Sequence, residues 1–372
     1  MTSEELSKDT FEASFAKAKE QIGRVNIGLF GKTGVGKSSL LNAVFGADIS
    51  ATGVGAPVTR GSKLHLHTDG HLGIIDNEGL EIGSDSKTIL KDLKKMVKNL
   101  RDAPEADQLH LAWYCVRATD SRFEDVEAEF VRELAALDVP VVLVLTRASH
   151  TSTGVVHPEH EALASHIGAL GLPIFEGKPL VLSAQGDEGL GFEPFGLLEL
   201  LDATFRAAPD GVAGAIAAAQ ILDQSRKESE ARKVIAAAAA GAAAIGASPI
   251  PFTDAALLVP VQSAMMMRIA ALYGLDLGKS TMLALIATQA ATQGGRSLVT
   301  NLLKFIPGYG TVAGGAISAS VASALTAAMG LAWLEVVKRV ASGALDPSIM
   351  NDAEGLAKIF MDELKNAAKL AK

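Results

Sequence analysis

The stretch RVNIGLFGKTGVGKSSLLNAVF, residues 24–45, joins an apolar run, a glycine-rich loop and an amphipathic segment in that order. Within it, Gly31, Gly36, Lys37 and Ser38 complete the pattern Gly-x-x-x-x-Gly-Lys-Ser/Thr. The glycines permit backbone conformations that other residues avoid, so amide N–H groups can approach an anion closely. The sequence therefore predicts a strand, a phosphate-binding P-loop and a helix whose N-terminus faces the phosphates.

The residues of this loop have distinct predicted roles. Lys37 supplies a positive charge for the β- and γ-phosphates, and the Ser38 hydroxyl is a predicted ligand of Mg²⁺. The alternative, a glycine-rich turn that binds no ligand, fits the flanking strand and helix patterns less well. The loop residues that we predict to bind nucleotide are Gly31, Lys32, Thr33, Gly34, Val35, Gly36, Lys37, Ser38 and Ser39.

Length and charge limit the classes of protein that this chain can belong to. Its 372 residues are enough for two domains with a large core. Residues 1–205 carry 19 basic and 30 acidic side chains, whereas residues 206–372 carry 15 basic and 12 acidic ones. An acidic first half argues against non-specific nucleic-acid binding, so no nucleic-acid partner is expected.

The cysteine count and the N-terminal sequence bear on the compartment. A single cysteine, Cys115, excludes a disulfide framework and a cysteine-based metal site. Cys115 lies in an apolar run, so we predict a buried thiol. Residues 1–23 contain no basic segment followed by an apolar one, which argues against a secretory signal. A cytoplasmic location is the expectation that follows.

Strand and helix patterns alternate after the P-loop. The loop 46–61 is rich in small residues, and residues 63–67 and 71–75 form a predicted hairpin around the turn signal Asp69-Gly70. Further strands are predicted at 110–117, 139–145 and 179–182, with helices at 87–100 and 123–137. This alternation is typical of an α/β domain with a doubly wound sheet and its ligand at the strand C-termini.

A second phosphate-site pattern follows the hairpin. Residues 76–79, Asp-Asn-Glu-Gly, fit Asp-x-x-Gly at the C-terminal end of a strand. There the Asp76 carboxylate can hold Mg²⁺ through water, and the Gly79 amide can meet a γ-phosphate. The pattern is weak alone but gains weight from its place behind the P-loop.

Residues 24–205 resemble the translation-factor-related GTPases, most closely the bacterial Era-like branch. The resemblance rests on "GKTGVGKSS", on Thr59 in "GVGAPVTRG", and on "DNEG", "TRAS" and "SAQ", which occur in the family's order. It implies a doubly wound P-loop GTPase domain that hydrolyses GTP to GDP and phosphate with Mg²⁺. It also implies that Lys37, Thr59 and Gly79 are catalytic and that Ser38, Thr59 and Asp76 hold the metal. The residues that it places at the nucleotide base are Thr146, Arg147, Ser183, Ala184 and Gln185.

Three positions depart from the family. Ser149 stands where the family has the aspartate that selects guanine, so strict guanine specificity is not secured. Leu80 stands where Ras-type proteins have a water-positioning glutamine, which implies slow turnover without dimerisation or a partner. Gly34 stands where potassium-activated members have asparagine, so potassium stimulation is not expected.

The second half has a different composition. The uncharged stretch 305–334 includes a predicted helix at 311–334, about 36 Å long and sufficient to cross a bilayer. Small residues recur every fourth position, at Gly310, Gly314, Ser318, Ala322, Thr326 and Gly330, and larger ones form a second stripe. Small stripes allow close helix approach in lipid or in water. Membrane insertion and a soluble Ala-rich bundle therefore both remain open.

The segments at 247–274 and 302–319 also resemble a C-terminal helical domain of unknown function that follows Era-like GTPase domains in bacteria. The predicted organisation is an N-terminal helix (1–23), the GTPase domain (24–205), a connecting helix (206–232), an Ala/Gly-rich helical domain (233–350) and a C-terminal helix (351–372).

The leading functional hypothesis is a GTP-hydrolysing switch that moves the helical domain, either in a homo-oligomer, with an effector, or at the inner face of the cell membrane. The alternatives are a nucleotide-dependent assembly module with little hydrolysis and a dynamin-like membrane-remodelling GTPase.

Overall fold

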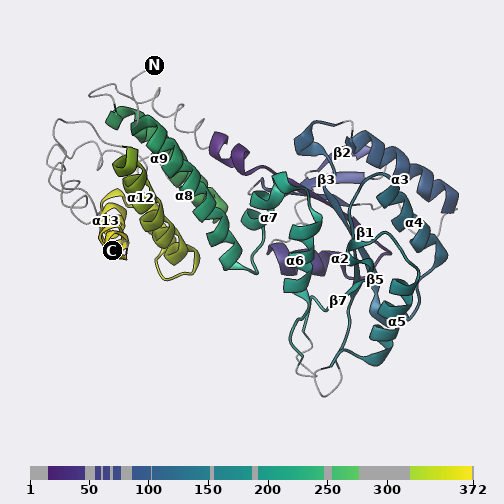
Figure 1. Ribbon diagram of the computed structural model, residues 1–372. Helices are drawn as coiled ribbons and strands as arrows, with labels where there is room; N and C mark the ends of the chain where they lie inside the picture. The colour runs from purple at the N-terminus through teal and green to yellow at the C-terminus, as the bar shows by residue number, and fades with distance from the viewer. Residues whose placement is uncertain are drawn as a thin grey trace. The chain divides into compact units, whose positions relative to one another are not determined.

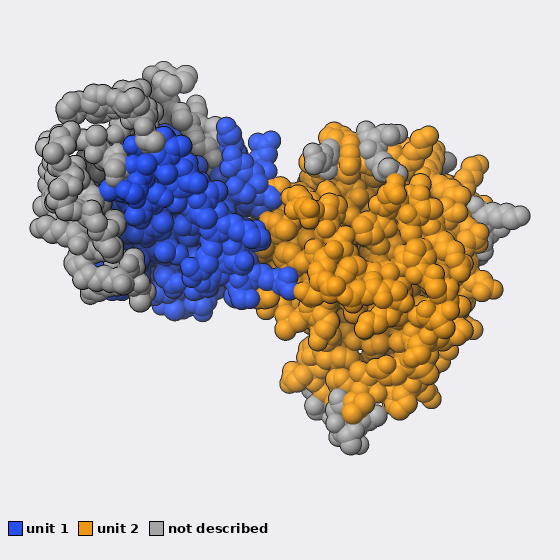
Figure 2. Space-filling view, in the orientation of Figure 1, with its two compact units in different colours: residues 1–22, 224–372 blue, residues 23–223 orange. Residues whose placement is uncertain are grey.

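The chain divides into two compact units, residues 23–223 and residues 1–22 with 224–372 (Figure 2). The computed structural model describes residues 16–46, 55–59, 62–67, 70–76, 86–101, 103–150, 155–186, 192–246, 254–275 and 319–370.

The first unit is built on a seven-stranded sheet in the order β2-β3-β4-β1-β5-β6-β7 (Figure 1). Strands β4, β1, β5, β6 and β7 pair in parallel, whereas β3 is antiparallel to both β2 and β4. The carboxyl ends of the parallel strands therefore share one edge. The strands are β1 Val25–Phe30, β2 Gly55–Thr59, β3 Ser62–Leu66, β4 Leu72–Asp76, β5 Leu111–Arg117, β6 Val141–Thr146 and β7 Leu180–Val181.

Helices cover both faces of this sheet, as the predicted doubly wound fold requires (Figure 1). On one face pack α2 Lys37–Phe45, α6 Leu197–Ala207 and α7 Ala213–Ala219; on the other pack α3 Ser86–Arg101, α4 Asp125–Ala136 and α5 Pro158–Ala169. Short 3-10 turns lie at Glu105–Asp107, Ala118–Asp120, Phe175–Gly177 and Asp210–Val212.

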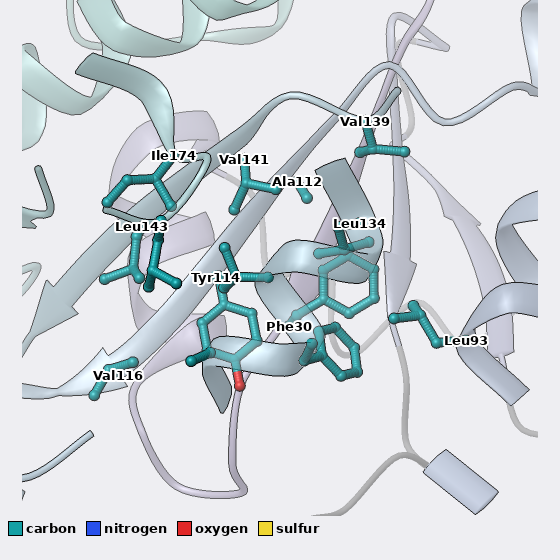
Figure 3. Close-up of a cluster of buried hydrophobic side chains, with 14 of the residues drawn as sticks. Phe30, Leu93, Ala112, Tyr114, Val116, Leu134, Val139, Val141, Leu143 and Ile174 are labelled. Carbon is teal, nitrogen blue, oxygen red and sulfur yellow. The ribbon is translucent and has the colours of Figure 1, made fainter. Parts of the chain in front are cut away.

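Burial explains why the central strands are so apolar. Every residue of β1 and β6 is buried, because helices cover these strands on both sides. Figure 3 shows the core on the α3/α4 face, where Phe30 of β1 and Tyr114 of β5 meet Leu93 of α3 and Leu134 of α4. Alternate residues of the same strands face α2 and α6 instead, which gives the sheet two separate cores.

The region 46–61 differs from its prediction as a loop. Residues Gly55–Thr59 form β2, which pairs antiparallel with β3 at the edge of the sheet. Its glycine, alanine and proline do not favour a strand, but an edge strand tolerates proline because one side needs no hydrogen-bond partner. The pairing register shifts between Pro57 and Thr59.

The single connecting helix predicted for 206–232 is wrong. The structure ends α6 at Ala207 and then forms a 3-10 turn, α7 and, after a break at residues 220–223, α8 Gln224–Gly246. Pro209 lies between α6 and the turn, where it interrupts helical hydrogen bonding. The Gln220 side chain then closes the second break, with hydrogen bonds to both the carbonyl and the amide of Asp223 at 2.7 Å.

This second break is attached to the far end of the P-loop helix. The Ile221 amide donates to the carbonyl of Val44, in the last turn of α2, at 3.0 Å. Gly46 ends α2 with a φ of +74°, and a Cβ at Gly46 would lie 2.9 Å from the Ile221 side chain. Residues 220–223 are therefore packed directly on the C-terminus of α2.

The second unit is helical. Its long helices are α8, α9 Asp254–Leu272, α12 Ala319–Ala341 and α13 Ala353–Leu370, with a short helix at 16–22 and a 3-10 turn at Pro347–Asn351. Helix α12 packs against α8, α9 and α13. The buried side chains of Gln262 and Thr326 hydrogen-bond at 3.1 Å, which fixes the register of α9 against α12.

The small-residue stripe of α12 lies at one of these contacts. A Cβ at Gly330 would lie 2.7 Å from Ile235 of α8 and 2.8 Å from Met265 of α9, so only glycine fits there. Residues 311–318 of the predicted helix and the first part of the stripe lie outside the described residues. Helix α12 also continues past Leu334 to Ala341. Its last two turns are amphipathic, since the charged residues Glu335, Lys338 and Arg339 alternate with buried valines.

One helix of the described residues, α12, is long and apolar enough to cross a membrane. More than half of its most apolar window, 56 %, is buried within the structure. A core helix of a water-soluble bundle has the same length and composition, so these properties alone do not indicate insertion.

The single cysteine provides a first test of the fold. Cys115 lies at the centre of β5 and is fully buried, and burial raises the pKa of its thiol to about 12. Since the thiolate is the reactive form, we expect an aromatic disulfide reagent at pH 8 to modify the native protein at least about a thousandfold more slowly than the denatured protein. The denatured chain should react at one thiol. Rapid modification of the native protein would contradict this core.

Candidate functional site

The P-loop joins β1 to α2 through glycines with positive φ. These φ values are +127° at Gly31, +76° at Gly34 and +102° at Gly36. A Cβ at Gly31 would lie only 2.1 Å from the carbonyl oxygen of Cys115, so the loop passes against the backbone of β5. Both the conformation and the close approach explain why glycine is needed at this first position of the pattern.

Lys37 extends back over this loop. Its Nζ donates to the carbonyl oxygens of Gly31 at 2.9 Å and Lys32 at 3.1 Å. Gly36 begins α2 without a side-chain cap, and the first turn of α2 holds no acidic residue. Since Gly36 has no side chain to cap the amides at this helix end, these amides and Lys37 form a positive surface suited to phosphate.

The Lys32 side chain points away from this surface. Its Nζ lies 2.9 Å from Glu124 and 3.6 Å from Glu127, at the start of α4. Its hydrogen bond lowers the pKa of the Glu124 carboxyl, whereas burial raises the pKa of the Glu127 carboxyl. Of the predicted nucleotide-binding residues, Lys32 thus ties the loop to α4 by its side chain and leaves its backbone for phosphate.

Arg117 is a site residue that the sequence analysis missed. It ends β5, and its Nη2 donates to the carbonyl oxygen of Gly34 at 2.7 Å. Arg117 also lies 3.8 Å from Asp120. A basic residue at the C-terminal end of a central strand was the only signal in the sequence, and the topology was needed to place it beside the P-loop.

The "TRAS" segment follows β6 and contacts the P-loop directly. The buried Thr146 hydroxyl donates to the carbonyl oxygen of Val35, with the carbonyl of Val116 at 3.1 Å. Arg147 has a φ of +54°, and its Nε lies 3.4 Å from the place of a Cβ on Gly36. The structure therefore brings the predicted base-binding residue Arg147 beside the predicted phosphate loop.

A pocket of about 310 Å³ opens next to these residues. It joins the P-loop to "TRAS" and "SAQ", three segments far apart in sequence, because the strands that precede them are parallel. Its size suits a small-molecule ligand. The pocket is lined by Gly36, Ser39, Thr146, Arg147, Ala148, Ser149, His150, Ser183, Ala184, Gln185, Gly186, Phe192, Glu193 and Phe195.

A buried histidine supports the wall of this pocket. The Ser149 amide donates to Nδ1 of His160, which lies in α5, at 3.3 Å. Burial, followed by the neighbouring His157, lowers the pKa of His160. The hydrogen bond needs the neutral imidazole, because a protonated Nδ1 cannot accept.

We therefore expect His160→Leu to leave the Ser149 amide unsatisfied, at a cost of about 1 kcal/mol, and to weaken ligand binding in the pocket several-fold at pH 7.5. The lowered pKa means that the stabilisation by His160 is complete above pH 6.5 and is lost as the pH falls through the folded-state pKa. Melting temperatures of both proteins from pH 5 to 8 should differ most at the alkaline end. A constant difference would contradict this role.

The predicted metal and switch residues lie at the same edge of the sheet. In the parallel pairing of β1 and β4, Asp76 is the partner of Leu29, one residue before the end of β1. Thr59 ends β2 and pairs with Ser62, while the next residue, Lys63, pairs with Asp76. The backbone thus places Asp76 beside the end of β1 that leads into the P-loop, and Thr59 two strands beyond Asp76, on the far side of β3. Gly79 and Leu80 lie outside the described residues.

The comparisons with known proteins agree with this architecture. Residues 26–147 match the family described as "50S ribosome-binding GTPase", and residues 214–359 match a "Domain of unknown function (DUF697)". No curated protein matches the chain.

Two solved structures are similar at low identity. A probable GTP-binding protein engB is 19 % identical with a TM-score of 0.34, over 49 % of this chain and 98 % of its own. A variant of Era from Aquifex aeolicus bound to GDP and AlF4⁻ is 17 % identical with a TM-score of 0.33, over 58 % of this chain and 66 % of its own. By the two family matches, the chain carries a GTP-binding P-loop GTPase domain of the 50S ribosome-binding GTPase family, followed by a helical domain of unknown function.

Proposed function

We propose that the chain is a GTP-dependent switch, which hydrolyses GTP to GDP and phosphate and passes its nucleotide state to the helical unit. The observation that carries this proposal is the placement of Lys37 and Arg147. Lys37 lies over a P-loop that leads directly into a pocket bordered by Arg147. A triphosphate on the loop and a base in the pocket would occupy adjoining parts of one site.

In this proposal the phosphates bind to the loop amides and to Lys37. Ser38, in the first turn of α2, Thr59 and Asp76 offer hydroxyl and carboxylate oxygens, which are the ligands that Mg²⁺ prefers. When bound, Mg²⁺ would neutralise the charge on the phosphates. Arg147 would stack on the base, and the backbone of residues 183–185 would contact its edge.

Arg117 gives hydrolysis a second fixed cation. A glutamine that orients the attacking water is absent at Leu80, so charge stabilisation has to come from other groups. The guanidinium of Arg117 is held at the Gly34 carbonyl, on the same loop as the ammonium of Lys37. Positive charge placed at transferring phosphates stabilises the transition state.

Turnover of GTP by the full chain with Mg²⁺, measured over a range of protein concentrations, tests this proposal. Hydrolysis of GTP but not ATP supports a GTPase, and a specific rate that rises with concentration supports activation by self-association. Tight nucleotide binding without turnover would support the alternative, an assembly module, which Leu80 favours. Binding of no nucleotide would refute both.

The site of action is a further part of the proposal. The helical unit would move within a soluble oligomer, bind a cytoplasmic effector, or contact the inner face of the cell membrane. Flotation with anionic and neutral liposomes, with and without a non-hydrolysable GTP analogue, separates these cases. Nucleotide-dependent flotation would support the membrane case, and protein that stays at the bottom of the gradient would exclude it.

A further inference from the structure

The pocket beside the P-loop contains one carboxylate, and it does not come from the expected segment. The family's aspartate is replaced by Ser149, which cannot accept two hydrogen bonds in the same geometry. Among the residues that line the pocket, Glu193 is the one with a carboxylate. It lies just after the "SAQ" segment and outside all of the family patterns that the sequence analysis used.

The segment that carries Glu193 is firmly attached to the end of the sheet. Ser183 and Phe195 form an antiparallel bridge, with both backbone hydrogen bonds at 3.1 Å. A Cβ at Gly186 would lie 2.3 Å from the Phe192 carbonyl, and one at Gly196 would lie 2.5 Å from Leu182. Residues 192–196 are therefore held against the loop that follows β7 on both sides of Glu193.

The segment around Glu193 also forms the aromatic side of the pocket. Phe192, Glu193 and Phe195 all line the pocket. The Phe195 ring stacks on His150 with centroids 3.8 Å apart, and Phe192 meets His150 edge-on at 6.3 Å. These rings give the pocket an aromatic wall, which suits a flat base, and Glu193 lies between the two phenylalanines in the sequence.

The free carboxylate is available to a ligand. Glu193 is exposed, and across the described ranges no cation forms an ion pair with it. The other charged residue of the pocket lining is Arg147, which lies along the P-loop at Gly36. The pocket thus offers a positive side next to the phosphates and a negative acceptor at the other segment.

We propose that Glu193 selects guanine, by accepting hydrogen bonds from N1–H and the C2 amino group of the base in place of the missing aspartate. This inference rests on the proposed function, since it assumes that the pocket holds the base of a nucleotide. Adenine has a lone pair at N1 and no amino group at C2, so it offers the carboxylate no donor and faces it with an acceptor.

Exchange of the acceptor for an amide changes which base fits. Xanthine keeps N1–H but has a carbonyl at C2, so it matches a glutamine side chain, which accepts from N1–H and donates to the carbonyl. Glu193→Gln should therefore weaken GDP binding about tenfold to hundredfold and strengthen XDP binding by a similar factor. Glu199→Gln, an exposed glutamate of α6 that does not line the pocket, is the matched control.

Titration calorimetry of the full chain with GDP, XDP and ADP in Mg²⁺ separates the outcomes. The proposal is supported if the wild type binds GDP selectively, Glu193→Gln binds GDP more weakly and XDP more tightly, and Glu199→Gln binds both as the wild type does. Selective GDP binding that persists unchanged in Glu193→Gln overturns the role of Glu193 and leaves the GTPase proposal intact. Equal binding of GDP and ADP, or binding of neither, overturns guanine recognition itself.

A second variant guards against an indirect effect of the substitution. In Glu193→Ala with Ser149→Asp, the carboxylate returns to the position that it has in the family. Recovery of GDP binding from the level of Glu193→Ala alone supports a direct role for a carboxylate at the base. Failure to recover, in a protein with an unchanged melting temperature, would argue against the proposed orientation of the base.

Discussion

Replacement of Lys37 by alanine should abolish measurable binding of guanine nucleotide to the full chain, and GTP turnover with it. Nζ of Lys37 is the ammonium held over the P-loop, by the carbonyls of Gly31 and Lys32. A charge-assisted contact to phosphate in a partly enclosed loop is worth about 3 kcal/mol or more, so the loss in affinity should exceed about a hundredfold. Calorimetry with GDP and a phosphate-release assay would measure both effects.

The fold should survive this change, because Lys37 is only half-buried and its removal breaks two hydrogen bonds to part-buried carbonyls of the loop. The melting temperature without nucleotide should therefore stay close to that of the wild type. Lys98→Ala, on the exposed face of α3, is a suitable control with the same change in net charge. Wild-type affinity in Lys37→Ala would mean that nucleotide does not bind at the P-loop.

Replacement of Trp333 by alanine should unfold the helical unit at markedly lower denaturant concentration. Trp333 is fully buried in α12, its indole N–H donates to the carbonyl of Met266 at 2.9 Å, and its ring meets Phe360 of α13 edge-on at 6.3 Å. Removal of such a side chain leaves a large cavity and breaks this hydrogen bond, at a cost of about 3–5 kcal/mol. The loss of helical circular dichroism in urea measures this change.

The chain offers an internal control for this experiment. It contains two tryptophans, and the other, Trp113, is buried in β5 of the GTPase unit, where it stacks on Phe45. In Trp333→Ala the fluorescence therefore reports the GTPase unit alone. We expect nucleotide binding and the Trp113 fluorescence to persist at the urea concentrations at which the circular dichroism of the helical unit is lost. An unchanged urea midpoint would contradict the packing of α12.

Much of the GTPase unit could be predicted because its signals are local. The P-loop glycines, the apolar runs of β1 and β6, and the turn glycine Gly70, whose φ is +81°, each specify their own structure over a few residues. Parallel strands then bring their C-terminal ends together, so the prediction that "TRAS" and "SAQ" share a site needed only the topology. The family matches and the sheet order confirm this fold.

The residues that were missed act across long sequence distances. Arg117, His160 and Glu193 reach the site from β5, α5 and the segment before α6, and none belongs to a pattern with fixed spacing. The edge strand β2 was missed because its small residues and Pro57 favour a loop. Residues 55–59 become a strand because they pair with β3, and this pairing cannot be predicted from the sequence of 55–59 alone.

In the helical unit, composition alone could not predict the packing partners of α12. A long apolar helix with a small-residue stripe predicts close packing but does not say against what. In α12 the stripe at Gly330 meets α8 and α9, a contact that no periodicity within α12 could identify. Hydropathy alone left both membrane insertion and a soluble bundle open, because both bury the same side chains.

The hydrogen bond between Ile221 and Val44 has a mechanical meaning. Helix α2 has nine residues, so it is a rod about 14 Å long with the phosphate loop at one end and the Val44 carbonyl near the other. A short helix moves as a rigid lever. Any shift of α2 toward a bound anion therefore pulls on the backbone at Ile221, two residues before the GTPase unit ends. The P-loop and the last residues of the GTPase unit are therefore joined to opposite ends of one short helix.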